Sequence, residues 1–523
     1  MNPSKEVVGT ELWRLTATEI ASRVNAGKLK AVDVVASSLE RLRAVNPRVN
    51  AVIVTCAEAL KDAAEVDERV ARTGFGGRLA GVPVTIKAGA DQKGYLTDSG
   101  AKHFAQTAAE TDSPQVKSLK DAGAVVIGRT NMPAFGCRWF SRSSLHGLTR
   151  NPVNPKITSG GSSGGAAAAV AVGIGPVAHG TDIAGSIRFP AYACGIHGIR
   201  PSLGRVGQFN DSSGDRQIGG QLMAVSGPLA RSIPDLREAY EVMCAPDCRD
   251  SQQVQVPLRP ASVCAKEGKP LRVGVWACPQ IGGEYDTEVV DAVRQAAEKL
   301  RAAGHEVSDC DGSVPQEADL HAVAHSAAVL WASEYEGVDQ RLKHTVDRTG
   351  DPDAIFAVSG LLRMSGVAAS EWGCANFGQA LMRALTERSK GIRQWGCFFQ
   401  SFDVLLCPVS SRLAFRECED VESEEAFDAV WKAQALQRMF PALAVPAIAV
   451  STGTVRRRLT TASSGLAGGE LEGGSVSEEF WEDVPVGVQL VAERFHEEFL
   501  FRAGEDLIRG TEKEVVTPVN SHG

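Results

Sequence analysis

The chain lacks several features that mark other classes of protein. Aromatic residues form only 6% of its 523 residues, and its 12 cysteines include no Cys-x-x-Cys pair. No stretch approaches the roughly 18 consecutive apolar residues of a membrane-spanning helix. The start of the sequence lacks the apolar core of a secretion signal. We therefore expect a cytoplasmic protein that keeps its thiols reduced and has no membrane span.

Positive charge is not in excess either. The sequence has 55 Lys and Arg residues against 63 Asp and Glu residues, a formal net charge of −8. This balance gives no electrostatic attraction to nucleic acid or to an anionic membrane. We also find no Gly-x-Gly-x-x-Gly nucleotide motif, and the His321 and His325 pair has no apparent third metal ligand. The sequence thus predicts no nucleic-acid partner, no metal and no organic cofactor.

The length and pattern of the chain predict a large α/β domain. Hydrophobic residues at 43% and charged residues at 23% are ordinary for a globular protein. Residues 271–276 have the pattern of a buried strand, residues 287–303 that of an amphipathic helix, and a second strand begins at 305. Because strands from the beginning, middle and end of the chain must meet in one sheet, we predict a single domain.

The first 75 residues are predicted to form a helical segment that packs on this core. Thr16 and Glu19 form the capping-box pattern of a first helix. A second helix is expected over 31–45, and Pro47 is expected to end it. We assign residues 76–510 to the main domain.

Three later segments differ in composition from the rest. Residues 316–400 are predicted to be mostly helical and contain several aromatic side chains. Residues 452–480 are rich in Gly, Ser and charge, which predicts a flexible polar insert at the surface. Residues 511–523 are predicted to form a frayed tail.

Two glycine-rich turns that carry serine lie between residues 158 and 190. The first reads Gly-Gly-Ser-Ser-Gly-Gly over 160–165, and the second reads Ala-Gly-Ser over 184–186. Glycine permits positive φ and leaves backbone N–H groups accessible, which favours close approach to a bound or reacting group. On its own, the first turn also fits a flexible linker or an anion-binding loop. The linker is disfavoured because residues 166–172 have the pattern of a buried helix of small apolar residues.

Together with more distant motifs, these turns resemble the signature of the amidase signature family, serine hydrolases that use a Ser–cis-Ser–Lys triad. The resemblance covers most of the chain, roughly residues 10–510. Its further motifs are a lysine strand at 81–87, an asparagine element at 123–133, Asn151-Pro152, Gly227 to Ser232, and Pro485 to Val491. The resemblance implies a mixed twisted β-sheet covered by helices on both faces.

By family position, the resemblance implies that Ser186 is the nucleophile, Ser162 the cis-serine and Lys87 the base. A serine hydroxyl is a weak nucleophile that needs an adjacent base, and no Gly-x-Ser-x-Gly element points to a Ser-His-Asp triad. Lys87 follows an apolar run at 82–86, where burial lowers the pKa of an amine and favours its neutral form. Neutral Lys87 can then take a proton from Ser162, which takes one from Ser186 and later returns it to the leaving amine.

Backbone N–H groups are expected to form an oxyanion hole beside the nucleophile. They belong to Ile183, Ala184, Gly185 and Ser186. The resemblance also implies supporting positions at Ser163, Asp182, Arg188 and Asn131. We predict that Arg188 pairs with Asp182 and braces the turn, the alternative being a solvated surface pair.

Two positions depart from the family pattern near the predicted site. Ala88 stands where the family usually has an acidic residue, and Ala184 stands where the first of two glycines usually precedes the nucleophile. Alanine keeps its N–H but adopts positive φ only at a cost. If the turn requires positive φ at residue 184, we expect strained geometry there.

The sequence therefore predicts an amidohydrolase that cleaves the C–N bond of an amide through an acyl-serine intermediate. A carbamate or an ester fits the same machinery, because the oxyanion is the same. The resemblance places residues 316–400 at the acyl-binding wall, and their aromatic side chains favour a small apolar or aromatic amide, although a helix core would contain the same residues. The resemblance also places the leading helices at a subunit contact, as in a homodimer, and packing on their own sheet is the alternative.

Two other functions fit the same motifs. One is the amide-transferring subunit of a tRNA-dependent amidotransferase, which requires a partner subunit and a path for ammonia. The other is a non-catalytic binding scaffold of the same fold, which Ala88 and Ala184 favour.

Overall fold

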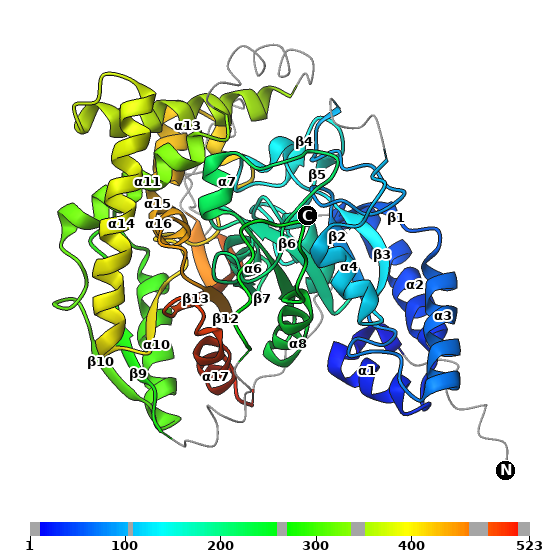
Figure 1. Cartoon of the computed structure of the whole chain (residues 1–523). Coiled ribbons are helices and arrows are strands. Elements are labelled where there is room, and N and C mark those ends of the chain that lie inside the picture. Colours follow the sequence, from blue (N-terminus) through cyan, green and yellow to red (C-terminus); the bar gives the residue numbers. More distant parts are fainter. Residues whose placement is uncertain (1–10, 103–107, 259–268, 336–350, 460–479, 511–523) are drawn as a thin grey trace, which may run out of the picture.

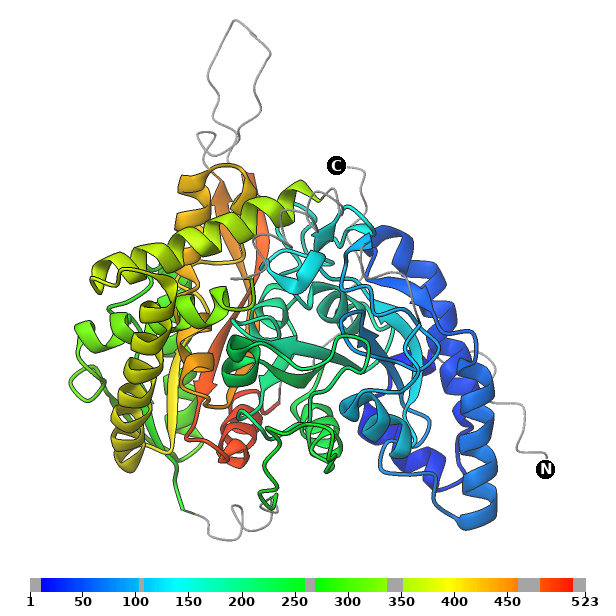
Figure 2. The same cartoon turned by 45° about the horizontal axis from the view of Figure 1, so that its top comes forward.

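An eleven-stranded mixed β-sheet runs through the molecule, and helices pack on both of its faces (Figures 1 and 2). The larger of two hydrophobic clusters extends from Ala17 near the start of the chain to Leu507 near its end. The predicted α/β class with a mixed sheet is confirmed. The computed structural model describes residues 11–102, 108–258, 269–335, 351–459 and 480–510.

Strands from distant parts of the sequence lie side by side in the sheet. The order is β1-β3-β2-β6-β8-β7-β12-β13-β11-β9-β10. The strands are β1 Val52–Thr55, β2 Pro83–Lys87, β3 Val125–Thr130, β6 Val177–Asp182, β7 His197–Arg200, β8 Val225–Ala230, β9 Arg272–Val275, β10 Glu306–Asp309, β11 Val404–Pro408, β12 Ala447–Leu459 and β13 Phe480–Val491. Strand β2 is parallel to β3 and β6, whereas β6 is antiparallel to β8 and β12 is antiparallel to β13. The short strands β4 Arg142–Ser143 and β5 Gly147–Leu148 form a separate pair.

Most of the helices fall into four groups around the sheet. The first group, α1 to α4, surrounds the β1–β3 edge, and α5 and α6 lie against the central strands (Figure 1). Helices α8, α10 and α17 form a row along the sheet, while α11, α13, α14 and α16 pack together in a hydrophobic cluster that includes Leu405 and Cys407 of β11. Their bounds are α1 Ala17–Asn25, α2 Ala31–Val49, α3 Ala59–Thr73, α4 Pro114–Asp121, α5 Gly164–Ala171, α6 Arg188–Ala193, α7 Ile218–Met223, α8 Ile233–Met243, α10 Thr287–Ala302, α11 Glu317–Ala332, α13 Pro352–Glu371, α14 Phe377–Ser401, α15 Glu424–Ala433, α16 Ala435–Ala442 and α17 Glu497–Leu507. In the described ranges, no helix is long and apolar enough to cross a bilayer.

Small residues allow α5 to lie deep in the protein. Every residue of α5 is buried, and the helix lies against β2, β6 and β8. A side chain at Gly165 would come within 2.5 Å of the backbone N and O atoms of Asn131. The alanine and glycine sequence of this helix therefore lets its first turn approach the sheet closely, which positions the two serines that precede it.

The leading helices agree with the sequence in part. Thr16 and Glu19 form the predicted capping box at the start of α1. The predicted end of α2 is wrong, because the helix continues through Pro47 to Val49. Proline is tolerated there because only its own N–H bond is lost in the last turn, and Asn50, in the left-handed conformation, then ends the helix.

The later segments also agree in part. Residues 316–400 are largely helical, as predicted, and contain α11, α13 and most of α14. The prediction of a loop from residue 452 is wrong for residues 452–459, which extend β12 alongside β13. The β-branched side chains of Thr452, Thr454 and Val455 favour this extension. Residues 460–479 and the predicted tail at 511–523 lie outside the described residues.

Candidate active site

Lys87 is the last residue of β2, and its side chain is wholly buried. Its Nζ atom lies 2.7 Å from Ser162 Oγ, 2.9 Å from Ser163 Oγ and 2.8 Å from Thr181 Oγ1. In the described part of the chain, no carboxylate forms an ion pair with this amine. The amine of Lys87 is therefore surrounded by neutral hydroxyl groups.

This environment changes the acidity of the amine. Burial lowers the pKa of Lys87 to about 7, and the negative charge of Asp182 opposes the shift only in part. The effect of burial that the apolar sequence around Lys87 predicted is confirmed. A substantial fraction of the amine is neutral at pH 7 and can accept a proton.

The first glycine turn brings its two serines to this amine. The peptide bond between Gly161 and Ser162 is cis. A side chain at Gly161 would lie within 2.4 Å of the backbone N of Phe140, so the turn requires glycine at this position. The Ser163 N–H donates to the carbonyl oxygen of Ser186 at 3.2 Å. This bond joins the first turn directly to the second.

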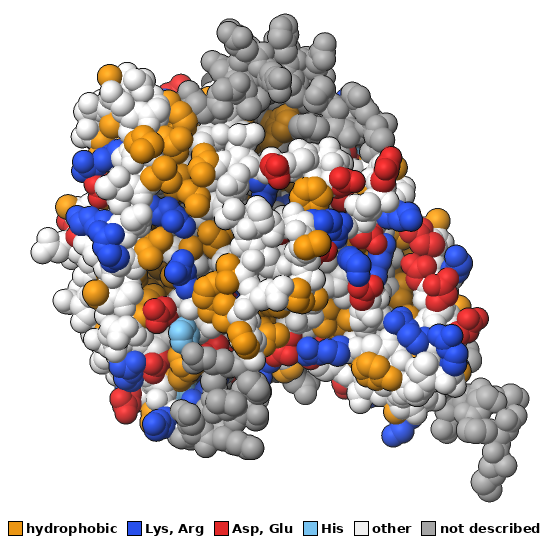
Figure 3. All heavy atoms as spheres, viewed as in Figure 1, with side chains coloured by type: hydrophobic (Ala, Val, Ile, Leu, Met, Phe, Trp, Pro, Cys, Tyr) orange, Lys and Arg blue, Asp and Glu red, His pale blue; other side chains and the backbone are white. Residues whose placement is uncertain are grey.

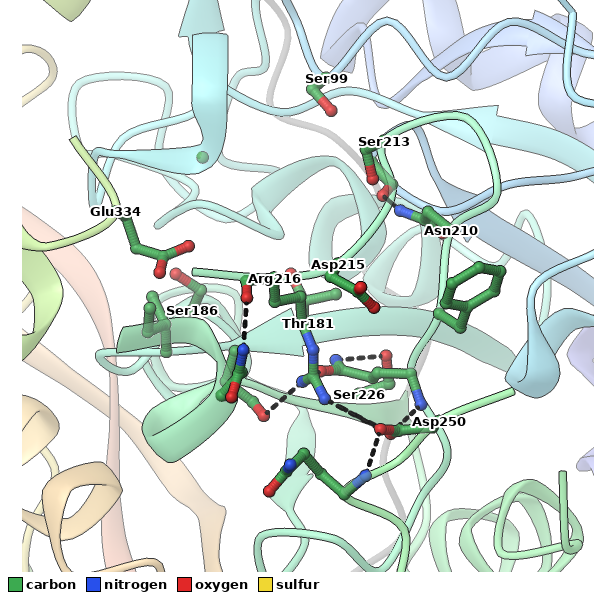
Figure 4. Close-up of a pocket in the computed structure, with 18 of the residues that line it drawn as sticks. Ser99, Thr181, Ser186, Asn210, Ser213, Asp215, Arg216, Ser226, Asp250 and Glu334 are labelled. Atoms are coloured by element: carbon green, nitrogen blue, oxygen red, sulfur yellow. Dashed lines mark hydrogen bonds and ion pairs between the residues drawn. The ribbon is translucent and has the colours of Figure 1, made fainter. Parts of the chain in front are cut away.

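Ser186 lies in the second turn, between β6 and α6. Its exposed fraction is 4% and that of Ser162 is 3%. Both residues line one cavity, and Figure 4 shows Ser186 at its wall. The structure therefore brings together Lys87, Ser162, Ser163 and Ser186, as predicted.

Asp182 holds the second turn together. Its carboxylate accepts hydrogen bonds from the N–H of Gly185 at 2.8 Å and of Ile187 at 3.2 Å, and from Arg188 Nε at 2.9 Å. Burial alone would raise the pKa of Asp182, but the guanidinium groups of Arg188 and Arg200 bring it to about 2. The side chains of Asp182 and Arg188 are fully buried, so the predicted pair is an internal brace and not a surface pair.

The backbone conformation of the turn settles the question raised by Ala184. The positive φ falls on Gly185, at +102°, and Ala184 is not among the residues with positive φ. A side chain at Gly185 would come within 2.4 Å of Gln437 Oε1. The condition for strain at Ala184 is therefore not met, and glycine stands where the turn requires it.

One predicted oxyanion donor is already engaged. The N–H of Gly185 donates a hydrogen bond to Asp182 Oδ1 at 2.8 Å, so it takes part in the brace and is not free to bind a substrate oxygen in this structure. Within the described ranges, the N–H groups of Ile183, Ala184 and Ser186 have no hydrogen-bond acceptor. These three N–H groups are free to bind an oxygen atom.

Asn131 does not touch the amine or the serine hydroxyls. Its side-chain nitrogen donates to Gly147 O at 3.1 Å and to Thr149 Oγ1 at 3.0 Å. Its backbone lies against Gly165 in the first turn of α5. Asn131 thus fixes the loop that supports the start of α5.

Two contacts in the site were not predicted. Thr181 is the third hydroxyl residue around Lys87, and its Oγ1 accepts a hydrogen bond from the amine at 2.8 Å. Trp139 donates from Nε1 to the carbonyl oxygen of Ala184 at 2.7 Å, inside the protein. A signal for Thr181 was available, since it directly precedes Asp182 in the signature, whereas nothing in the sequence connects residue 139 with residue 184.

The cavity at the two serines has an apolar part and a polar part. Its empty space is about 1150 Å³, open solvent included. Apolar lining residues include Met132, Phe135, Trp331 and Tyr335. Polar lining residues include Asn210, Arg216, Asp250 and Glu334, which Figure 4 labels. Among the described residues, no group of three or more His, Cys, Asp or Glu side chains could hold a metal ion. A basic amine, hydroxyl groups and unpaired N–H groups at one cavity suit hydrolysis through a serine.

Comparison with known proteins places this chemistry in a family. The family model described as Amidase matches residues 33–501. An indoleacetamide hydrolase of Bradyrhizobium diazoefficiens is 39% identical over 403 residues, which cover 76% of this chain and 72% of the relative. A glutamyl-tRNA(Gln) amidotransferase subunit from Acidothermus cellulolyticus is 31% identical over 433 residues, 79% of this chain and 83% of the relative.

Solved structures share the fold. A bacterial aryl acylamidase of the amidase signature family superposes with a TM-score of 0.76 at 23% identity, covering 96% of this chain and 98% of that one. A 6-aminohexanoate cyclic dimer hydrolase in complex with its substrate has a TM-score of 0.72 at 25% identity, with 95% and 97% covered.

The chain belongs to the amidase family, as the family match over most of its length shows. It is an enzyme that hydrolyses the C–N bond of an amide. The alternative of a non-catalytic scaffold is therefore set aside.

Proposed function

We propose that the enzyme hydrolyses small primary amides with an aromatic acyl group, of the arylacetamide type. The observation that carries this proposal is the position of Phe135, Trp331 and Tyr335 on the same cavity as Ser186. Flat aromatic side chains provide apolar surface and ring-to-ring contacts for an aromatic substrate. The similarity to an indoleacetamide hydrolase supports the same class of substrate.

Ser186 is the proposed nucleophile. Its Oγ bonds to the amide carbonyl carbon, and its proton passes to Ser162 as the proton of Ser162 passes to neutral Lys87. The 2.7 Å distance between Lys87 Nζ and Ser162 Oγ supports this route. Return of the proton through Ser162 to the leaving nitrogen releases ammonia and leaves an acyl-Ser186 ester.

Water completes the reaction by the reverse of this path. It adds to the ester carbonyl while Lys87 and Ser162 accept its proton, and the proton then returns to Ser186 as the carboxylic acid is released. We assign the oxyanion hole to the N–H groups of Ile183, Ala184 and Ser186. Donors that are fixed before the reaction stabilise the developing negative charge without reorganisation.

The supporting residues act by positioning. We propose that Ser163 orients the Lys87 amine, which lies 2.9 Å from its Oγ. Asp182 and Arg188 hold the turn that carries Ser186. Asn131 fixes the loop beneath α5.

The proposal is tested with indole-3-acetamide and phenylacetamide as substrates and ammonia release as the readout. We expect turnover of both, and labelling of Ser186 by a fluorophosphonate, located by peptide mass mapping. The Ser162→Ala variant should acylate slower by orders of magnitude. Turnover of short aliphatic amides alone would contradict the aromatic substrate class, and labelling at another serine would contradict the nucleophile.

Amide transfer is the second candidate function, because the chain is 31% identical to an amidotransferase subunit. It predicts ammonia release from glutamine, and only in the presence of a partner subunit. Failure to release ammonia from arylacetamides, combined with partner-dependent glutamine hydrolysis, would favour this function.

Location and assembly complete the proposal. We propose a cytoplasmic enzyme, since every described cysteine is a free thiol. We further propose a homodimer formed through the N-terminal helical segment, where Leu60 of α3 and Phe75, just beyond the end of α3, are 44% and 55% exposed. Light scattering during size-exclusion chromatography measures the mass, and a monomer at micromolar concentration would contradict the dimer.

A further inference from the structure

Glu334, just beyond the end of α11, places a carboxyl group on the wall of the cavity. In Figure 4 its carboxyl group extends from the segment after α11 into the same cavity as Ser186. One of its oxygens, Oε1, accepts a hydrogen bond from the N–H of Gly220 at 2.6 Å. In the part of the chain that the structure describes, the second oxygen, Oε2, has no hydrogen-bond donor.

The guanidinium groups that line the cavity are occupied elsewhere. Arg216 donates to Gln208 Oε1 at 2.6 Å and to Asp250 Oδ1 at 3.2 Å. Arg249 forms an ion pair with Asp247 at 2.6 Å. These bonds leave the carboxyl group of Glu334 without a direct cationic partner.

The surroundings of Glu334 explain which ligand group could reach it. Trp331, three residues before Glu334, and Tyr335, the residue after it, line the same cavity. Burial raises the pKa of Glu334, while the Gly220 N–H and the charge of Arg216 oppose this shift. Glu334 is partly buried on this wall, so a substrate that covers it can place a hydrogen-bond donor against its free oxygen.

We propose that Glu334 selects aromatic acyl groups that carry an N–H donor on the ring, by accepting that hydrogen bond at Oε2. This inference rests on the proposed function and adds a specificity-determining residue to it. Trp331 and Tyr335 on the same cavity provide the apolar contact for the substrate's ring, and a ring N–H provides the bond that a purely hydrocarbon or sulfur-containing ring cannot make. A site built to accept a hydrogen bond rejects a ligand without the donor, because the acceptor is then buried unpaired.

The test compares two substrates of nearly equal shape. Indole-3-acetamide has a ring N–H, and 1-benzothiophene-3-acetamide has sulfur in its place. For wild-type enzyme we expect kcat/KM to favour the indole by roughly ten- to a hundredfold, the effect of one hydrogen bond to a charged acceptor. Because the benzothiophene is the more apolar ring, a preference for the indole cannot come from hydrophobic contact.

Two variants separate substrate selection from a structural role. Glu334→Met removes the acceptor, and the preference should fall to about onefold through loss of the indole rate, with the benzothiophene rate retained. Ser333→Ala is the matched control, since Ser333 Oγ accepts from the adjacent Gly219 N–H at 3.0 Å and supports α7 in the same way. Ser333→Ala should lower the melting temperature and leave the substrate preference unchanged.

The outcomes distinguish this inference from the proposed function. Equal wild-type rates on the two amides, or equal loss of both rates in Glu334→Met, would overturn the role of Glu334 alone. Failure of the wild-type enzyme on both amides would overturn the proposed function and this inference with it. If Glu334→Met does not fold, Glu334→Gln serves as the second variant. Its one side-chain oxygen is needed for the Gly220 N–H, so an amide NH₂ takes the place of Oε2. An unchanged substrate preference in Glu334→Gln would therefore count against acceptance of a hydrogen bond at Oε2.

Discussion

The Nζ atom of Lys87 lies 2.7 Å from the Oγ atom of Ser162, and both side chains are almost fully buried. Because no solvent separates the two atoms, a proton can pass between them directly. The same burial keeps the pKa of Lys87 at about 7, where an amine can serve as a base under physiological conditions.

Replacement of Ser186 tests the nucleophile. We expect Ser186→Ala to lower kcat on indole-3-acetamide by roughly four to six orders of magnitude, as removal of a catalytic serine does in other serine hydrolases. The variant should unfold at the same urea concentration as wild type, because Ser186 Oγ makes no hydrogen bond to a described residue. Residual activity within tenfold of wild type would contradict the assignment.

The pH dependence of kcat/KM tests the base. Only neutral Lys87 accepts a proton, and its pKa is about 7. With an uncharged amide, kcat/KM should rise about tenfold per pH unit below 7 and level off above it. Asp182, with a pKa of about 2, stays ionised throughout this range. A flat profile between pH 5.5 and 8 would count against Lys87 as the base.

The stability of Lys87→Met tests the same pKa without catalysis. Unfolded Lys87 keeps its proton up to its ordinary pKa of 10.5, whereas the folded residue keeps it only up to about 7. Between these values the unfolded state binds more protons than the folded state. The contribution of Lys87 to the wild-type free energy of unfolding therefore rises with pH. The methionine variant lacks the gain, so its stability relative to wild type should be greatest at or below pH 7 and decline toward pH 9.

Urea unfolding at pH 6.5 and pH 9 measures this difference. Lys61→Met is the control, because the Lys61 side chain is 78% exposed. Its effect on the free energy of unfolding should be equal at the two pH values. A difference for Lys87→Met that does not change with pH would show that the folded amine titrates normally.

Asp182→Asn should be strongly destabilising. It leaves the buried guanidinium groups of Arg188 and Arg200 without their carboxylate, and breaking a buried pair in this way costs about 3–5 kcal/mol. Asp428→Asn breaks an exposed pair with Arg363 and should cost at most about 1 kcal/mol. Similar losses in the two variants would mean that the internal brace contributes little.

Trp139→Phe should weaken the turn that carries the proposed oxyanion donors. It keeps an aromatic ring but removes the N–H bond to Ala184 O, at a cost of about 1–3 kcal/mol in stability. We expect kcat to fall more than KM changes, because the turn and not the substrate wall is affected. Trp395→Phe is the control, since Trp395 Nε1 has no partner among the described residues. Equal effects on kcat in both variants would contradict a role for the Trp139 bond.

The sequence predicted the parts of the site that are local. Ser162, Ser163 and Ser186 lie within one continuous signature, and the apolar run before Lys87 indicated a lowered amine pKa. The strand and helix between the two serine turns fix their separation, so a short stretch of sequence contains most of the geometry. The fold class followed from the same kind of evidence, because alternating strand and helix patterns leave few other architectures.

The remaining parts depend on contacts between distant segments, which no local pattern encodes. Trp139 reaches Ala184, and Gly220 contacts Glu334 across 114 residues of sequence. The aromatic residues in 316–400 do not by themselves predict which side chains line the cavity. Trp331 lines it, whereas Trp395 lies in a separate hydrophobic cluster. Whether Ala184 or Gly185 has positive φ also depends on packing, since both stand in a plausible turn position.

The brace behind Ser186 sets a condition on the synthesis of the enzyme. Arg188 Nη1 donates to Gln489 Oε1 at 2.7 Å, and 301 positions separate the two residues along the chain. A ribosome therefore makes Lys87, Ser162 and Ser186 long before it makes the strand that completes their support. Until β13 has left the ribosome and joined the sheet, the growing polypeptide carries the proposed catalytic residues without the support that Gln489 gives to Arg188.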